Sequence, residues 1–320
     1  MYTYEKVLNS STIEAAAVSF PHDTIKVSGY LYLPQGQMPE GGWPAVVIGH
    51  PTGGVKEQTA GVYAVKLAER GIAMLTFDAS YQGESGGEPR YLEDPSVRSE
   101  DLSCGIDYLT TRADIDAGKL GVLGICASGG YAIHAAETDL RMKAIATVSM
   151  ADLGDMFRTG LGRQQTAAQR RDFLAQIAAA RSREANGAEP LYAPFVPRTA
   201  EDAAKMPRDY REGYEYYRVS PNAHPRAVSQ FLLSHANRLV AFTALDHVEL
   251  LAPRPLLMIA GTEAQTRYFS EEAYASYPEN AGKKELTFVK GATHIEMYYV
   301  EEYVDQAVAK LSAFYQANLV

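Results

Sequence analysis

The stretch Gly121-Val-Leu-Gly-Ile-Cys-Ala-Ser-Gly-Gly130 decides the fold of this chain. It begins as an apolar run over residues 119–126, which is typical of a buried strand. Residues 131–137 follow and are mostly strong helix formers without proline. A strand that turns sharply into a helix strains the residue at the bend, so the neighbours two positions away must be small. The stretch therefore predicts a nucleophile elbow with Cys126 at the bend.

Two side chains compete for the bend. With Cys126 there, the small flanking residues are Gly124 and Ser128; with Ser128 there, they are Cys126 and Gly130. A cysteine at the start of a helix also meets the positive end of the helix dipole, which favours the thiolate. We expect Cys126 to be the nucleophile and keep Ser128 as the alternative. The bland interpretation is that the glycines only permit close packing and that Cys126 is a small buried side chain.

Short apolar runs alternate with helical segments on both sides of the elbow. Several of these runs are apolar throughout, as strands of parallel sheets are. The alternation is typical of a doubly wound, mostly parallel sheet, and it predicts an α/β fold. The expected strands cover residues 15–20, 24–33, 45–48, 71–77, 119–126, 144–148, 255–260 and 285–289.

The alternation stops after residue 149. Residues 151–248 are mostly helical or irregular and polar, with a turn-rich connector expected at 190–197. Four tyrosines between residues 210 and 217 are expected to pack this segment against the core rather than to recognise a substrate. We interpret the chain as an α/β core interrupted by a helical cap insertion. The expected parts are residues 1–150 (core, first part), 151–250 (cap) and 251–320 (core, second part).

Composition limits the partners of this chain. With 320 residues and 46% hydrophobic residues, it can bury a large core. A net charge of -9 argues against nucleic acid or an anionic membrane as the main partner. Two cysteines are too few for a disulfide scaffold. The start of the chain has no signal-peptide pattern, and no apolar run approaches the roughly 18 residues of a transmembrane helix. We expect a cytoplasmic protein, and a homo-oligomer stays open.

A thiol nucleophile needs a base to take its proton. His294 is the best base, because it follows the last expected strand in a short loop before a helix. Open α/β sheets gather reactive groups at the carboxyl ends of their strands, which is where this loop lies. His50 borders the same edge, and we expect it to shape a loop there rather than to act as the base. The other five histidines lie in an early turn, the elbow helix or the cap.

The oxyanion donors are expected in the segment Gly49-His-Pro-Thr-Gly-Gly54, which directly follows a strand. Pro51 has no backbone N–H. The backbone N–H of Thr52 or Gly53 is therefore the expected first donor. The second is the N–H of Ala127, the residue after the nucleophile. A plain glycine-rich turn is the alternative for this segment.

Three motifs in this order resemble the α/β-hydrolase superfamily and, within it, the dienelactone-hydrolase-like branch that uses cysteine. They are His50-Pro-x-Gly-Gly-Val-Lys-Glu-Gln58, Gly124-Ile-Cys-Ala-Ser-Gly-Gly-Tyr131 and Gly291-Ala-Thr-His294. They are also similar to motifs of bacterial proteins and of fungal polyketide-transferase-like proteins. The resemblance covers roughly residues 25–150 and 251–318. It implies the chain order nucleophile, acid, base.

The resemblance implies an acid in the loop Gly261-Thr-Glu-Ala-Gln-Thr266, where superfamily members usually place an aspartate. This loop has none. Glu263 is the expected acid. The alternatives are that Gln265 occupies the acid position, that Asp152 substitutes, or that no acid is used. A Cys–His pair depends less on an acid than a Ser–His pair, because a thiol ionises more easily.

These residues and the resemblance together imply a hydrolase that cleaves an ester, thioester or lactone through an acyl-enzyme on Cys126. The expected partner is a small-molecule acyl substrate, with no cofactor and no metal, since no His, Cys and Asp cluster has ligand spacing. One alternative is an acyltransferase of the polyketide-transferase type. Another is a non-catalytic binding protein with the same fold, because a fold alone does not guarantee chemistry.

Overall fold

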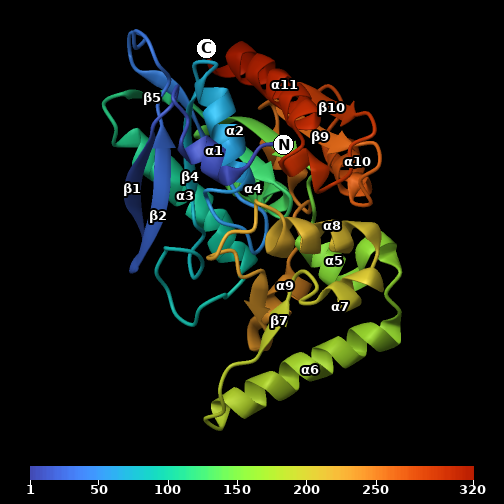
Figure 1. Cartoon of the computed structure of the whole chain (residues 1–320). Helices are drawn as coiled ribbons and strands as arrows, with labels where there is room; N and C mark the ends of the chain where they lie inside the picture. Colours follow the sequence, from blue (N-terminus) through green and yellow to red (C-terminus); the bar gives the residue numbers. More distant parts are fainter.

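An eight-stranded sheet forms the centre of the molecule in the computed structural model, which describes all 320 residues (Figure 1). The strand order is β1-β2-β4-β3-β5-β6-β9-β10. The six strands from β4 to β10 run parallel, and the β1–β2 hairpin joins antiparallel at one edge. The strands are β1 (Ala15–His22), β2 (Ile25–Tyr32), β3 (Trp43–Gly49), β4 (Ala73–Phe77), β5 (Ile115–Ile125), β6 (Met142–Val148), β9 (Leu256–Gly261) and β10 (Lys284–Val289).

Helices cover both faces of this sheet, so its central strands are buried throughout. One face carries α2 (Thr59–Ala68) and α11 (Glu301–Leu319). The other carries α3 (Pro95–Thr110), α4 (Ser128–Thr138) and α10 (Arg267–Ser276). This arrangement confirms the doubly wound sheet expected from the alternating pattern. A short helix that the pattern did not predict, α1 (Tyr4–Leu8), packs on α2.

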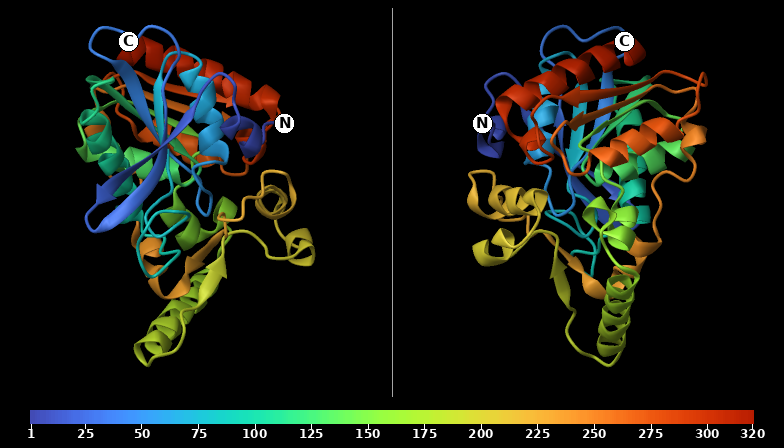
Figure 2. Two further views of the ribbon diagram at one scale, coloured as in Figure 1. Left: turned by 60° about the vertical axis from the view of Figure 1, so that its left-hand side comes forward. Right: turned by 90° about the vertical axis from the view of Figure 1, so that its right-hand side faces the viewer.

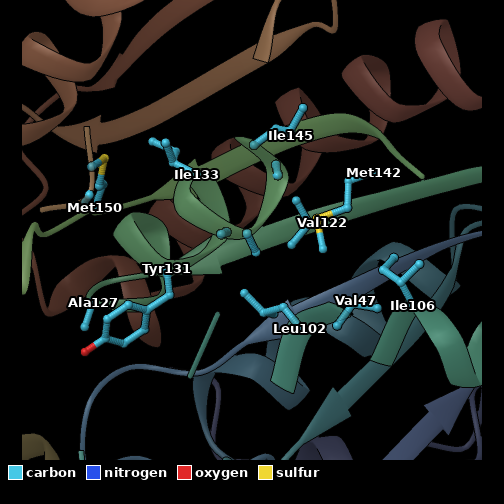
Figure 3. Packing of buried hydrophobic residues seen from close by; sticks show 14 of the residues in the cluster. Val47, Leu102, Ile106, Val122, Ala127, Tyr131, Ile133, Met142, Ile145 and Met150 are labelled. Carbon is cyan, nitrogen blue, oxygen red and sulfur yellow. The ribbon is translucent and has the colours of Figure 1, made fainter. Parts of the chain in front are cut away.

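The core between α3, α4 and the sheet fixes the position of the elbow (Figure 3). Leu102 and Ile106 of α3 lie near Val47 of β3 and Val122 of β5, and all four side chains are almost fully buried. Alternate residues of each strand point to opposite faces, so the neighbours of Val47 and Val122 along the chain enter the other core cluster. The two clusters together hold β5 and α4 rigidly on either side of the bend.

The segment between β6 and β9 adds no strand to the main sheet and lies at the carboxyl ends of its strands (Figure 2). Helix α6 extends from the body of the molecule, and only Ile177 and Ala180 along it are buried. The helices of this segment are α5 (Leu153–Thr159), α6 (Ala167–Ala185), α7 (Ala200–Ala204), α8 (Arg208–Tyr214) and α9 (Asn237–Ala241). We refer to this segment between β6 and β9 below as the cap. None of the helices is both long and apolar enough to cross a bilayer.

The cap also contains a two-stranded sheet that the sequence did not predict, formed by β7 (Tyr192–Pro194) and β8 (Gln230–Leu232). The expectation of a turn-rich connector at residues 190–197 was therefore incomplete. Each strand has only three residues, which is too short for the alternation of apolar and polar side chains to be recognised. The sheet joins two distant segments of the cap, because Ala193 pairs with Phe231, which lies 38 positions further along the chain.

A buried group of charges joins the cap to the core. The Lys56 ammonium is fully buried and contacts Asp78 at 2.8 Å, Glu84 at 2.7 Å and Glu57 at 3.1 Å. Arg226 of the cap pairs with both Glu57 and Glu84. Although burial lowers it, the carboxylates of Asp78 and Glu57 hold the pKa of Lys56 above its ordinary value. Lys56 is thus charged, and three carboxylates depend on it.

Replacing Lys56 with methionine would leave Asp78 and Glu57 buried without their main cation. We expect Lys56→Met to lower the free energy of unfolding by about 3–5 kcal/mol, measured by urea denaturation. The matched control is Lys205→Met, which removes an exposed pair with Glu201 and is expected to cost less than about 1 kcal/mol. Equal stability of the two variants would show that the buried group of charges does not stabilise the fold.

Candidate active site

Cys126 occupies the bend between β5 and α4. Its φ angle is 59°, a left-handed conformation that side chains other than glycine adopt rarely. A Cβ atom at Gly124 would lie 2.0 Å from the carbonyl oxygen of Ser128, so no residue larger than glycine fits there. The Cys126 carbonyl accepts hydrogen bonds from Gly129 at 2.8 Å and Ala151 at 2.9 Å, which hold the strained peptide. This is the elbow geometry that the glycine spacing predicts.

Ser128, the alternative for the bend, is the first residue of α4 and is turned below the loop after β3. Its hydroxyl donates to the His50 carbonyl at 2.6 Å and accepts from Arg98 at 2.9 Å. Only 2% of the residue is exposed. With its hydroxyl committed to two buried partners, Ser128 supports the loop around His50 and does not face the cavity described below.

Two backbone N–H groups, from Ala127 and Thr52, point to the Cys126 sulfur. They come from the start of α4 and from the loop after β3, as expected for the two oxyanion donors. Gly53 turns this loop, with φ at 71°, and its backbone packs against Ser229 of the cap. The Thr52 hydroxyl is buried without a partner and also lines the cavity. Of the two expected loop donors, the structure therefore brings Thr52 to the sulfur.

His50 fixes the loop that carries Thr52. Its Nε2 accepts from the Ala79 backbone at 3.1 Å, so its Nδ1 carries the proton and donates to the Pro51 carbonyl at 2.7 Å. Burial and the Arg98 guanidinium hold the pKa of His50 well below its ordinary value. A neutral imidazole with both nitrogens occupied cannot take a proton from Cys126, and it serves instead as a support for the loop.

Tyr298 lies between Cys126 and His294. Its hydroxyl is 2.8 Å from His294 Nε2 and within hydrogen-bond reach of the Cys126 thiol. The sequence reasoning missed Tyr298. It stands four residues after His294, a spacing that places two side chains of one helical turn side by side, and this is the signal that could have identified it. Sulfur, hydroxyl and imidazole thus form a continuous polar chain.

The other nitrogen of His294 meets a hydroxyl instead of a carboxylate. Thr266 Oγ1 lies 2.5 Å from His294 Nδ1. The structure does not bring Glu263 to His294: its side chain is exposed, and Thr262 donates to it at 3.4 Å. Gln265 is exposed as well and accepts from the backbone N–H of Asp209 at 3.1 Å. The position of the expected acid is held by Thr266.

Asp152, the reserve acid, has another role. Its carboxylate caps α5, accepting from the Asp155 backbone at 3.0 Å, and also accepts from the Ala244 backbone at 3.3 Å. Both oxygens are therefore engaged in holding cap segments to the end of β6. No group of three or more His, Cys, Asp or Glu side chains is arranged to hold a metal ion.

Burial controls the charges at this site. It raises the pKa of the Cys126 thiol, although the Tyr298 hydroxyl and the two backbone N–H groups act in the opposite direction. It lowers the pKa of His294 to about 4. The position at the start of a helix was expected to favour the thiolate, but loss of hydration outweighs it. At neutral pH the pair is a neutral thiol and a neutral imidazole, not an ion pair.

A cavity of about 110 Å³ opens beside these groups, between the elbow and the cap. Most of its wall is apolar, and its polar lining includes one carboxyl group, that of Asp209. A larger hollow of about 610 Å³ lies at the far end of the sheet, between β10 and α11, and contains none of the groups described above. The cavity is lined by Thr52, Cys126, Ala151, Leu153, Met156, Leu161, Phe195, Val196, Asp209, Tyr210, Gly213, Tyr217, Thr266, His294, Ile295 and Tyr298.

Known proteins resemble this chain over most of its length. The sequence model of the X-Pro dipeptidyl-peptidase (S15 family) matches residues 23–243. An uncharacterised Escherichia coli protein, YcjY, is 36% identical over 92% of this chain and 95% of its own. The crystal structure of a Pseudomonas aeruginosa protein, PA2218, has a TM-score of 0.90 and 32% identity over 100% of this chain and 98% of its own.

Two fungal proteins with named activities are more distant. A thiohydrolase from Aspergillus aculeatus is 28% identical over 74% of this chain and 73% of its own. An acyltransferase from Aspergillus calidoustus is 26% identical over 82% of this chain and 83% of its own.

We expect iodoacetamide to alkylate Cys126 and to spare Cys104 in the folded protein, as mapped by mass spectrometry. Cys104 is the internal control, because burial and then Glu100 raise its pKa to about 12 and it does not line the cavity beside Cys126. The raised pKa of Cys126 leaves little thiolate at neutral pH, so its alkylation rate should keep rising beyond the pH at which an ordinary thiol is fully ionised. Faster labelling of Cys104 would contradict this assignment.

Proposed function

We propose that this chain, which belongs to the X-Pro dipeptidyl-peptidase (S15) family and to the α/β-hydrolase superfamily, transfers acyl groups through a thioester bond to Cys126. Membership makes it an enzyme, a hydrolase or an acyltransferase with the α/β-hydrolase fold. The observation that carries the proposal is the polar chain from the Cys126 sulfur through the Tyr298 hydroxyl to His294 Nε2, with two backbone N–H groups at the sulfur.

In the first step the Cys126 sulfur adds to the substrate carbonyl carbon. The thiol proton passes to the Tyr298 oxygen while the Tyr298 proton passes to His294 Nε2. The carbonyl oxygen becomes an oxyanion and accepts from the N–H groups of Thr52 and Ala127. Each such donor typically contributes about 100- to 1000-fold to the rate. The tetrahedral intermediate then collapses and expels the leaving group, which takes up the proton held by His294 through Tyr298, so that an acyl-thioester on Cys126 and a neutral His294 remain.

In the second step the acyl-thioester is attacked by water, which gives hydrolysis, or by an alcohol or amine, which gives acyl transfer. His294 takes the proton of the acceptor through Tyr298, and the Cys126 thiolate leaves and recovers its proton. In the tautomer that this step uses, His294 Nδ1–H donates to the Thr266 hydroxyl and Nε2 is free to accept. Thr266 thereby supplies the orientation that an acid would supply, without its negative charge.

The missing carboxylate favours one kind of substrate bond. With a pKa of about 4, His294 is a weak base, so the protonated form that an amine leaving group needs before the bond breaks is sparsely populated. A thiolate leaves without first being protonated, because a thiol has a pKa of about 8.5. We therefore propose thioesters as the preferred substrates, then esters and lactones, ahead of the peptide bonds in the family's name.

The test is an acyl-enzyme trapped on Cys126. We expect short acyl thioesters and p-nitrophenyl esters to add one acyl group, located by mass spectrometry on the Cys126 peptide, and Cys126→Ala to abolish both adduct and turnover. Cys104→Ala is the matched control and should keep its activity.

Activity in Cys126→Ala together with loss of activity in Ser128→Ala would assign the nucleophile role to Ser128. Absence of any adduct or turnover would favour a non-catalytic binding protein, and a competing alcohol would separate hydrolysis from acyl transfer by its products.

Tyr298→Phe removes the hydroxyl between sulfur and imidazole. We expect kcat/KM to fall by about 100-fold or more, since general acid–base transfer contributes about 10²–10⁴-fold. The KM should change little, because the phenyl ring still fills its place. Tyr299→Phe, at the next and half-buried position, is the control. An unchanged rate in Tyr298→Phe would mean that His294 takes the proton directly.

A further inference from the structure

Asp209 belongs to the lining of the cavity that holds Cys126 and His294, and its buried carboxyl group has no hydrogen-bond partner. It lies in the first turn of α8, on the cap side of the cavity. Neither carboxylate oxygen is exposed to solvent, and neither has a hydrogen-bond partner. Its backbone N–H is bonded to Gln265, so the main chain is fixed while the side chain is unused. The carboxyl group stabilises nothing within the chain.

An unpaired buried carboxyl group lowers the free energy of unfolding. Leaving a buried acceptor without a partner costs about 1–3 kcal/mol, and more if it is charged. Burial, and then Glu212, raise the pKa of Asp209 to about 7. The adjacent Arg208 offsets this rise only in part, because its guanidinium donates to the Glu263 carbonyl. An unpaired carboxyl group in the lining of the same cavity as the Cys126 thiol is a candidate to bind a group of the ligand.

The surroundings of Asp209 define the ligand. The cavity wall on the cap side is apolar and includes Leu153, Met156, Phe195 and Val196. The cavity volume of about 110 Å³ is well below the roughly 300–1,000 Å³ of pockets that hold drug-sized ligands. This matches a short carbon chain that carries one polar substituent. The substituent must donate a hydrogen bond, because an ionised carboxylate only accepts.

We propose that the Asp209 carboxyl group rotates toward the cavity and binds a hydroxyl group of the substrate, so that the enzyme acts on short hydroxyacyl thioesters or esters. This inference rests on the proposed acyl transfer at Cys126. A hydroxyl fits both states of a carboxyl group that titrates near neutral pH: it donates to the carboxylate, and its oxygen accepts from the protonated acid. An ammonium group would have to lose its hydration against an apolar wall, which is far more costly than for a neutral hydroxyl.

The experiment compares butyryl, 2-hydroxybutyryl and 3-hydroxybutyryl thioesters of N-acetylcysteamine. We expect the wild type to prefer at least one hydroxybutyryl thioester over butyryl by about 10-fold or more in kcat/KM, as a hydrogen bond to a charged group allows. Asp209→Leu should bring that ratio to about one or below. Asp172→Asn, on the exposed face of α6, is the matched control and should retain the preference. The Tm of Asp209→Leu should not fall, because the carboxyl group holds no part of the fold.

Two results would overturn the inference. Equal losses of kcat on all three thioesters in Asp209→Leu and Asp209→Asn would instead make Asp209 a positioning residue for His294. An Asp209-dependent preference for 3-aminobutyryl over 3-hydroxybutyryl would assign the site to an ammonium group. Equilibrium binding of the same thioesters to Cys126→Ala, with and without Asp209→Leu, separates this inference from the proposed function. A preference for the hydroxyacyl thioesters that depends on Asp209 supports the inference even without turnover. Equal binding of all three thioesters refutes it.

Discussion

The site depends on one close approach, that of Gly124 to the Ser128 carbonyl. Because nothing larger than glycine fits at Gly124, β5 can run directly into α4 and leave Cys126 with a positive φ at the bend. That conformation projects the sulfur out of the sheet and turns the first N–H of the helix toward it. The backbone N–H of Ala127, the polar chain to His294 and the cavity all take their positions from this bend. The two buried clusters on either face of the sheet hold it in place.

A second set of buried polar groups supports the loop opposite the elbow. Arg98 donates to the His50 carbonyl and to Ser128, and His50 in turn accepts from the Ala79 backbone. Each of these bonds is out of contact with water, so losing one would leave its partner unsatisfied in the interior. The N–H of Thr52 is therefore held in its place before any substrate arrives. Stabilisation of an oxyanion is most effective when the donors need no rearrangement.

The sequence was sufficient for the parts of the molecule that follow from local patterns. Apolar runs predicted the strands, and the spacing of small residues around Cys126 predicted the bend. His294, Thr52 and Ala127 were identified because they follow predicted strands, and the fold brings them together. These inferences needed only neighbours along the chain and the rule that parallel strands end at one edge.

The remaining features of the site depend on contacts between distant segments. Thr266 and Asp209 reach the cavity from a turn and from the cap, and nothing in their local sequence separates them from ordinary polar residues. The expected acid, Glu263, lies in the right loop but on its exposed side, because the loop turns at a point that its composition does not reveal. The net effect of burial on Cys126 also needed the structure, since a helix terminus and loss of hydration act in opposite directions.

The buried charges around Lys56 have a consequence for how the cap moves. Arg226 ties the cap to two carboxylates of the core, and Gln58 donates to the Asn222 carbonyl in the same region. A hinge that swung the whole cap outward would have to expose or separate these charges, at a cost far above thermal energy. Access to Cys126 through the cavity therefore does not depend on movement of the whole cap. The cap is therefore better described as a fixed cover with a narrow opening than as a hinged lid.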